Sequence, residues 1–232
     1  MQLPKIDAPV FEIKLISQTK PIKYRPFTVR EEKILLIAEE GKDDNDILNA
    51  IRQVINNCCV SDVNVDKLPL FDIEHFFLQL RSKSVSNISV LRYKDKADDI
   101  VREFEVDLDT VKPFVDPKHT NVIKLSENIT VQFSYPTIST AMKVDRNSKD
   151  ADVEYLASCL ETIYEGEEGY NVKDFTQEQR VDWINDLSSK MFDQIIETFV
   201  DTMPSLSHTL KYINKNGDER KIILEGYKSF FP

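Results

Sequence analysis

The chain of 232 residues is poor in the residues that build several common kinds of site. Its five glycines, at 41, 166, 169, 217 and 226, leave no room for a Gly-x-Gly-x-x-Gly turn or a phosphate-binding P-loop. Its three cysteines, Cys58, Cys59 and Cys159, are odd in number and lack metal-ligand spacing, which indicates free thiols in a reducing compartment. No apolar run approaches the roughly 20 residues that span a bilayer, which predicts a soluble protein.

Histidine and positive charge are also scarce. The three histidines, His75, His119 and His208, form no His-x-x-x-His pair, so we expect them to be structural or surface residues. Acidic residues outnumber basic ones by 40 to 30, and this formal charge of −10 disfavours binding to nucleic acid and to anionic membranes. Hydrophobic residues make up 41% of the chain, enough for a core in one domain or in two small ones.

The first residues predict a β-hairpin and a capped helix. Apolar and polar residues alternate over 11–15 and again over 22–25, on either side of a turn-like segment. Thr28 and Glu31 form a capping box, in which each side chain satisfies a backbone N–H group at the helix start. We therefore expect a helix to begin near Val29.

Periodicity then predicts two more helices followed by strands. Apolar residues at three- and four-residue steps indicate one helix around 47–58 and another after Pro69. The period changes to two from Ile88, and again over 103–108 and 129–133. These segments are expected to be strands with one exposed face.

The second half returns to a helical period. An apolar stripe predicts a helix over 153–164, followed by a short loop at 166–169. Thr176 and Gln179 give a second capping box, after which a helical face continues, with a break at the adjacent serines 188 and 189, until Pro204 ends it.

A hairpin is predicted at the end of the chain. Its strands, near 209–212 and 221–224, join at Asn216–Gly217, a dipeptide that tolerates the positive φ of tight turns. We therefore expect an α+β fold with an N-terminal hairpin and helices, central antiparallel strands, and a C-terminal helical segment closed by a hairpin. The division proposed is an α+β region at 1–136 and a helical region at 137–232, within what can also be one continuous domain.

One acidic segment suggests an alternative function. Glu103, Glu105, Asp107 and Asp109 lie on one face of a predicted strand, where carboxylates could hold a hard cation. With His119 they would form a metal-assisted hydrolase. Alternation with apolar residues is also what any solvated strand face shows, and we favour that interpretation.

Several separated blocks resemble one protein family. They are KYRPFTVREEKILLIAEE at 23–40, INNC at 55–58, VDKLPLFDIEHFFLQLRSKS at 65–84, SYPT at 134–137 and LEGYKSFF at 224–231. Together they are similar to the baseplate hub assembly proteins of T-even-like contractile-tailed bacteriophages. None is a chemical motif; the signal is that they occur in the expected order.

The resemblance implies a late viral protein, made in the host bacterial cytoplasm, that helps to build the central hub of the tail baseplate. It implies hub subunits, and the tape-measure protein, as partners, and no enzymatic activity. The protein would act as an assembly factor or chaperone, or as a minor subunit that remains in the virion.

The chain departs from the family pattern in its last hairpin. Many members carry a Cys-x-x-Cys-Gly knuckle there, whereas this chain has Ile213-Asn214-Lys215-Asn216-Gly217. A tetrahedral zinc site needs thiolates or similar ligands, so we predict that an Asn–Gly turn closes this hairpin without metal and that no cofactor is used.

The predicted partner contacts are Arg25, Phe27 and Arg30. The arginines could engage carboxylates while Phe27 supplies an apolar anchor, as Trp183 and Tyr24 also could. The rival explanation is that Phe27 packs the hairpin on the first helix. A third possible function, inhibition of a host nucleic-acid enzyme by an acidic surface that mimics phosphate, is disfavoured because the acidic residues are mixed with basic ones.

Overall fold

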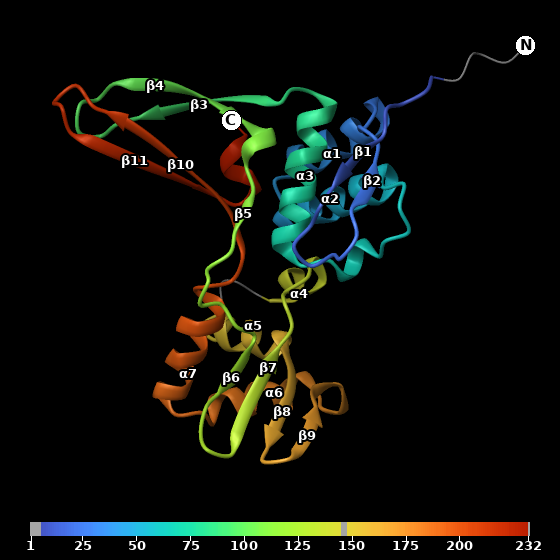
Figure 1. The fold of residues 1–232 in the computed structure, drawn as a ribbon, viewed down its shortest axis with the longest axis vertical. Coiled ribbons are helices and arrows are strands. Elements are labelled where there is room, and N and C mark those ends of the chain that lie inside the picture. Colours follow the sequence, from blue (N-terminus) through green and yellow to red (C-terminus); the bar gives the residue numbers. More distant parts are fainter. Residues whose placement is uncertain (1–5, 145–147, 232) are drawn as a thin grey trace, which may run out of the picture. The chain divides into compact units, whose positions relative to one another are not determined.

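The computed structural model describes residues 6–144 and 148–231. It divides into two compact units (Figure 1): the first combines the residues up to Phe114 with those from Ser205 on, and the second is Val115–Pro204. Residue 136, where the change of period placed a boundary, falls inside the second unit. Both units mix helices with small antiparallel sheets, so the predicted α+β class is confirmed.

The first unit holds the predicted hairpins and N-terminal helices. In its sheets β1 pairs with β2, β3 pairs with β4, and β10 lies between β11 and β5, always antiparallel. Its elements are β1 (Phe11–Ile13), β2 (Ile22–Tyr24), α1 (Val29–Gly41), α2 (Asp44–Cys58), η1 (Val65–Lys67), α3 (Leu70–Ser84), β3 (Ile88–Lys94), β4 (Val101–Asp107), η2 (Leu108–Thr110), β5 (Pro113–Phe114), β10 (Ser205–Ile213), β11 (Glu219–Glu225) and η5 (Tyr227–Phe230).

Local signals in this unit act as predicted. Helix α1 starts at the capping box, where the Thr28 N–H donates to Glu31 Oε2 at 2.8 Å. The last hairpin turns at Asn216–Gly217, with Gly217 at a φ of 84°. Asn214 Oδ1 accepts the backbone N–H groups of Asn216 and Asp218, so an amide side chain closes the turn.

A buried carboxylate ties the first hairpin to helix α3. Asp72 is fully buried and accepts the backbone N–H groups of Ile16 and Ser17, each at 2.9 Å. The ring of Tyr24, from β2, meets that of Phe76, from α3, at a centroid distance of 5.3 Å. The two N–H donors replace the water that the buried side-chain oxygens of Asp72 would otherwise bind, so polar and apolar contacts fix the same pair of elements.

The second unit is one four-stranded antiparallel sheet, in the order β6-β7-β8-β9, with helices that share its core. Val131 and Phe133 of the sheet pack with Leu156, Ile184 and Phe199 of the helical segments. Its elements are β6 (Val122–Lys124), β7 (Ile129–Phe133), α4 (Ile138–Lys143), α5 (Ala151–Cys159), β8 (Leu160–Glu165), β9 (Glu168–Asn171), η3 (Val172–Asp174), α6 (Gln177–Asn185), α7 (Ser189–Ile195) and the π-turn η4 (Ile196–Val200).

One predicted helix is wrong in its second half. The helix expected over 153–164 ends at Cys159, and the chain continues as strand β8. Leu160 and Ile163 fit the helical stripe, but they pair with Phe133 and Val131 of β7. A strand partner supplied by the fold overrides the local period. The second capping box, Thr176–Gln179, and the break at Ser188 are both found.

Candidate functional site

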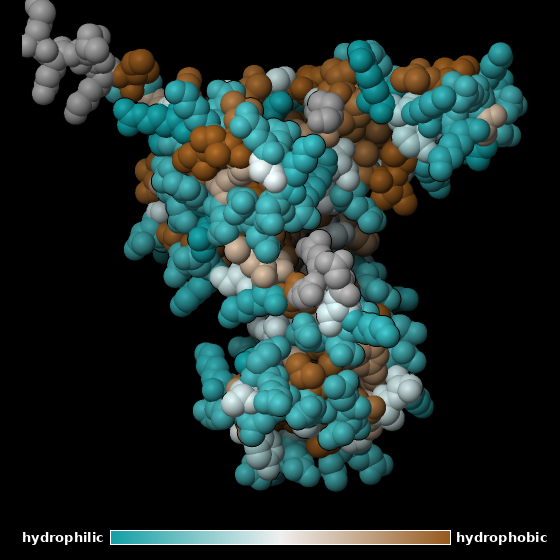
Figure 2. All heavy atoms as spheres, turned by 180° about the vertical axis from the view of Figure 1, so that it is seen from behind, coloured by the Kyte–Doolittle hydropathy of each residue, from teal (hydrophilic) through white to brown (hydrophobic). Residues whose placement is uncertain are grey.

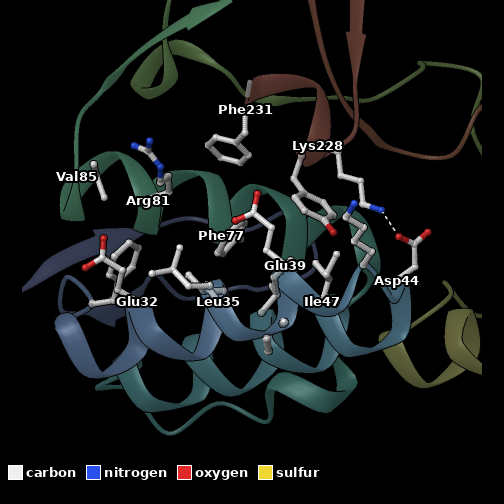
Figure 3. A pocket seen from close by; sticks show the side chains of 17 residues that line it. Glu32, Leu35, Glu39, Asp44, Ile47, Phe77, Arg81, Val85, Lys228 and Phe231 are labelled. Carbon is white, nitrogen blue, oxygen red and sulfur yellow. Dashed lines mark hydrogen bonds and ion pairs between the residues drawn. The ribbon is translucent and has the colours of Figure 1, made fainter.

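The first unit carries an open groove of about 710 Å³, lined by helices α1, α2 and α3 and by the C-terminal turn η5 (Figure 3). Eleven of its 17 lining residues are apolar or aromatic. The main ones are Leu35 and Leu36 from α1, Ile47 and Ile51 from α2, Phe77 from α3, Val85 just beyond it, and Tyr227 and Phe231 from the end of the chain. The size lies within the range of ligand-binding clefts.

Helix α1 leaves apolar side chains in solvent at this groove. Leu36 is 53% exposed and lines the groove, and its neighbour Ile37 is 70% exposed outside the lining. Glu31 is the only residue of α1 that is buried. Helix α1 therefore has apolar surface open to solvent, a feature typical of contact sites.

Charged residues stand at the edges of the groove. Glu32 and Glu39 lie along α1, and Arg81 projects from α3 with its guanidinium carbon 5.3 Å from the centre of the Phe231 ring. Burial lowers the pKa of Arg81 from its usual value. At one end, Lys228 Nζ pairs with Asp44 Oδ1 at 2.5 Å. The groove therefore has an apolar lining and a rim of mixed charge.

Turn η5 is fixed to helix α3 by a partly desolvated carboxyl group. Glu74 accepts the backbone N–H of Tyr227, and burial raises its pKa to about 7. Gly226 adopts a φ of 66°, and a Cβ added there would lie 3.3 Å from Glu74 Oε1, so this position favours glycine. Ser89 Oγ also donates to the Phe230 carbonyl at 2.5 Å. This wall of the groove is therefore anchored from two elements.

Of the three predicted contact residues, the structure brings only Phe27 into the lining. Phe27 is half-buried, and its N–H donates to Ser84 Oγ at 2.9 Å. Arg30 is exposed beyond the lining. The partner-contact role of all three residues stays a prediction.

Arg25 has internal partners that were not predicted. Its Nη2 lies 3.0 Å from Glu31 Oε1 and also donates to the Asn57 carbonyl at 3.0 Å, so it joins α1 to α2. Burial raises the pKa of Glu31, but hydrogen bonds from Arg25 and Thr28 outweigh it and bring the pKa down to about 2. An arginine engaged in this way is less free to pair with a partner.

The acidic segment has structural partners instead of a common focus. Glu103 pairs with Arg92 at 2.8 Å, Asp107 caps η2, and Asp109 pairs with Lys83 at 2.6 Å. Hydrogen bonds from Lys83 and Ser82 lower the pKa of Asp109. Among residues 6–144 and 148–231, no three histidine, cysteine or acidic side chains are grouped so that they could hold a metal ion.

Two of the cysteines are buried, as expected for structural thiols. Burial raises the pKa of Cys58 to about 11 and that of Cys159 to about 12, so both are protonated near neutral pH. The fold does supply a basic neighbour that the sequence does not reveal, because Arg25 Nη1 lies 3.7 Å from Cys58 Sγ. Its effect on the pKa is smaller than that of burial.

Sequence reasoning missed most of the groove. Tyr24 is core at 2% exposure and cannot anchor a partner, whereas Leu36, Arg81 and Phe231 were not singled out. Leu36 could have been found from its neighbour Ile37 on the same capped helix. Two adjacent apolar residues beside acidic ones give the helix more apolar surface than a single buried face needs.

The described residues thus form an α+β protein with an open, mainly apolar groove in its first unit. The chain matches the model of the family described as T4 bacteriophage base plate protein over residues 8–232, and it belongs to that family. The resemblance to baseplate proteins of T4-like phages is confirmed. No curated protein and no solved structure matches the chain. Within the described ranges, no helix is long and apolar enough to cross a membrane.

Proposed function

We propose that this protein helps to assemble the central hub of the tail baseplate by binding other baseplate proteins, without a chemical step. The observation that carries the proposal is the groove, which keeps an apolar lining open to solvent in a member of a baseplate family. Hub subunits and the tape-measure protein are the partners we propose. The contact would form in the host cytoplasm, before or during incorporation into the baseplate.

The occupant we propose for the groove is an amphipathic helix of a partner. Such a helix would place its apolar face on Leu36 and Phe231 and direct a basic flank toward Glu32 and Glu39 of α1. Acidic residues on the opposite flank would meet Arg81. This arrangement matches the charges of the rim and leaves the anchored turn η5 in place.

A matched pair of substitutions on α1 tests the groove. The chain is co-expressed with each hub protein and with the tape-measure protein, and complexes are measured by affinity capture and size-exclusion chromatography. Leu36→Asp should weaken the complex by about tenfold or more, because it places a charge against an apolar partner face. Ile37→Asp, at the adjacent exposed position outside the lining, should leave affinity within about twofold.

The result of this test is decisive either way. If the folded wild-type chain retains none of these proteins, the assembly proposal is wrong. If both substitutions act equally, the groove is not the contact surface. Mass spectrometry of purified virions separates a transient assembly factor, which should be absent, from a minor subunit, which should be present.

The metal-assisted hydrolase stays the weaker proposal. Glu103 and Asp109 form ion pairs with basic residues of their own unit, so less of their negative charge remains to bind a metal cation. Calorimetry with magnesium, manganese and calcium tests it, and heat of binding that disappears in Glu103→Gln and Asp107→Asn variants would support it.

A further inference from the structure

A second cavity, of about 530 Å³, lies within the second unit and is lined by three aromatic residues. Tyr170 comes from β9, Phe175 from the segment after η3, and Trp183 from α6. Ile129 and Ile163 add an aliphatic wall from the sheet. Tyr170 and Trp183 are half-buried and Phe175 is exposed, and tyrosine and tryptophan are the residues that most often dominate binding energy at protein interfaces.

The charge of the protein is concentrated in the unit that holds this cavity. Residues 115–204 include seventeen acidic and eight basic side chains, a formal charge of −9, whereas the rest of the chain has twenty-three and twenty-two, a formal charge of −1. On the face drawn in Figure 2, this unit is mostly hydrophilic. Any partner of the second unit must therefore tolerate, or be attracted by, a strongly negative field.

One carboxylate lines the cavity, and a second is bonded to a lining residue. Glu165 lines it, and the hydroxyl of Tyr170 donates to Glu168. Arg180 is the one basic residue of the lining, and its Nε donates to the Thr176 carbonyl at 3.3 Å. The exposed acidic residues of the hairpin β8–β9, of η3 and of α6 are Glu161, Glu165, Glu167, Glu168, Asp174, Glu178 and Asp182.

Aromatic faces and carboxylates together fit a cationic side chain with an aliphatic stem. A lysine or arginine can bury its methylene groups against the isoleucines and Trp183, place its charge over an aromatic face, and pair with Glu165. The charge on Arg180 would repel a cation at the α6 side and favour its placement near β8 and β9. An acidic or purely apolar segment would gain none of the charge contacts.

We propose that this cavity docks a segment of another baseplate protein in which lysine or arginine alternates with aliphatic residues. The proposal rests on the proposed function, because it assumes protein partners, but it uses a surface separate from the groove of the first unit. The protein would then have two contact surfaces of different chemistry, one apolar with a mixed rim and one aromatic within an acidic field.

The single tryptophan makes the test direct. Trp183 is the only tryptophan of the chain and lines the cavity, so its fluorescence reports occupancy of this site. The full-length protein is titrated with a peptide of alternating lysine and leucine, and with the same peptide carrying glutamate in place of lysine. We expect a saturable change in emission with the lysine peptide only, weakened several-fold when salt rises from about 0.05 to about 0.5 M.

Matched variants place the response at the cavity. Tyr170→Ser should weaken lysine-peptide binding about tenfold, and Glu165→Gln should weaken it several-fold. The control is Tyr164→Ser: Tyr164 is also an exposed aromatic of the hairpin β8–β9, but it follows Ile163 in the strand, faces the other side of the sheet and is outside the lining. It should bind as the wild type does.

Three results would overturn the proposal: no emission change at saturating peptide, an equal response to the glutamate peptide, or equal losses in the Tyr170 and Tyr164 variants. The Leu36→Asp variant separates the two proposals. It should lose binding to hub proteins through the groove and keep its tryptophan response, so failure of one surface does not imply failure of the other.

Discussion

The two units differ in charge, in chain continuity and in what their apolar surface does. The first is nearly neutral, is built from two distant parts of the chain, and exposes apolar residues along α1 and the hairpins; brown residues follow these hairpins in Figure 2. The second is continuous and strongly acidic, and three of its aromatic residues, Tyr170, Phe175 and Trp183, line one cavity. An average over the whole chain hides this difference, so net charge and exposed apolar surface are compared unit by unit.

The comparison also shows how the second unit enters the chain. Phe114 of β5 and Ser205 of β10 are paired residues of one antiparallel sheet, so the chain leaves the first unit and returns to it at adjacent positions. An insertion at such a point leaves the host sheet intact. The near-neutral unit should therefore be a complete fold without the acidic one.

Excision of the second unit gives the largest expected effect. Residues 115–204 are replaced by Asn-Gly, which can form a two-residue hairpin turn between Phe114 and Ser205. We expect a folded protein with cooperative thermal unfolding, unchanged hub-protein binding through the groove, and complete loss of the lysine-peptide response. A shortened protein that is unfolded by circular dichroism would show that the first unit depends on the second, and the division drawn here would fail.

The difference between the units also explains how much of the fold the sequence predicts. The capping boxes at Thr28 and Thr176 and the turn at Asn216–Gly217 are local signals, and all three are confirmed. The pairing of β5 with β10 joins residues on either side of a 90-residue segment, and no local pattern reports it. Strand β8 was missed because Leu160 and Ile163, three residues apart, fit a helical period and not the two-residue period of a regular strand; a register shift opposite Gln132 and Phe133 of β7 accommodates this spacing in the sheet.

The candidate site is predictable only in part for the same reason. Phe27 could be named because it stands beside a recognisable cap, and it does line the groove. Its companions Phe77 and Phe231 come from elements that meet only in the folded protein. The internal role of Arg25 likewise depends on Asn57, from the end of α2, and on Glu31, which the capping box fixes in place.

The pH dependence of stability should distinguish the units, with the larger effect at Glu74 in the first. Its folded pKa of about 7 lies above the ordinary 4.5, so the unfolded chain binds fewer protons between these values and stability falls as pH rises through them. Glu74→Gln keeps an oxygen acceptor for Tyr227 and removes the charge. Its free energy of unfolding should exceed that of the wild type by up to about 3 kcal/mol at pH 8 and should nearly equal it at pH 4.5.

The variant comparison is needed because His75 acts in the opposite direction in the same unit. Burial lowers its pKa to about 4, so stability falls as pH drops from 6.5 toward 4. His75 is present in both proteins and cancels from the difference. If the difference in unfolding free energy between Glu74→Gln and wild type does not change with pH, the pKa of Glu74 is the same in the folded and the unfolded protein, and the raised value is wrong.

In the second unit the corresponding group is His119. Its hydrogen bonds determine which ring nitrogen carries the proton. Thr202 Oγ1 donates to the Thr198 carbonyl, so it accepts from His119 Nδ1–H at 2.8 Å, and Nε2 must accept the Tyr135 hydroxyl at 2.9 Å. This series of hydrogen bonds requires a neutral imidazole ring, and burial also lowers the pKa of His119. Stability from this group is present above pH 6.5 and lost as pH falls through the folded pKa.

We expect a small effect of pH on this unit, on the order of 1 kcal/mol between pH 7.5 and 5, read from Trp183 fluorescence during denaturant unfolding. His119→Phe keeps the ring stack with Tyr135 and Phe199 but has no proton to gain, so its unfolding should vary less with pH while being weaker by about 1–2 kcal/mol at pH 7.5. His208→Phe, in the first unit, is the control and should leave the tryptophan transition unchanged. Glu74→Gln and His119→Phe lie in different units, so each substitution should change the pH dependence of the unfolding transition of its own unit only; a shift of both transitions by either variant would mean that the two units unfold as one.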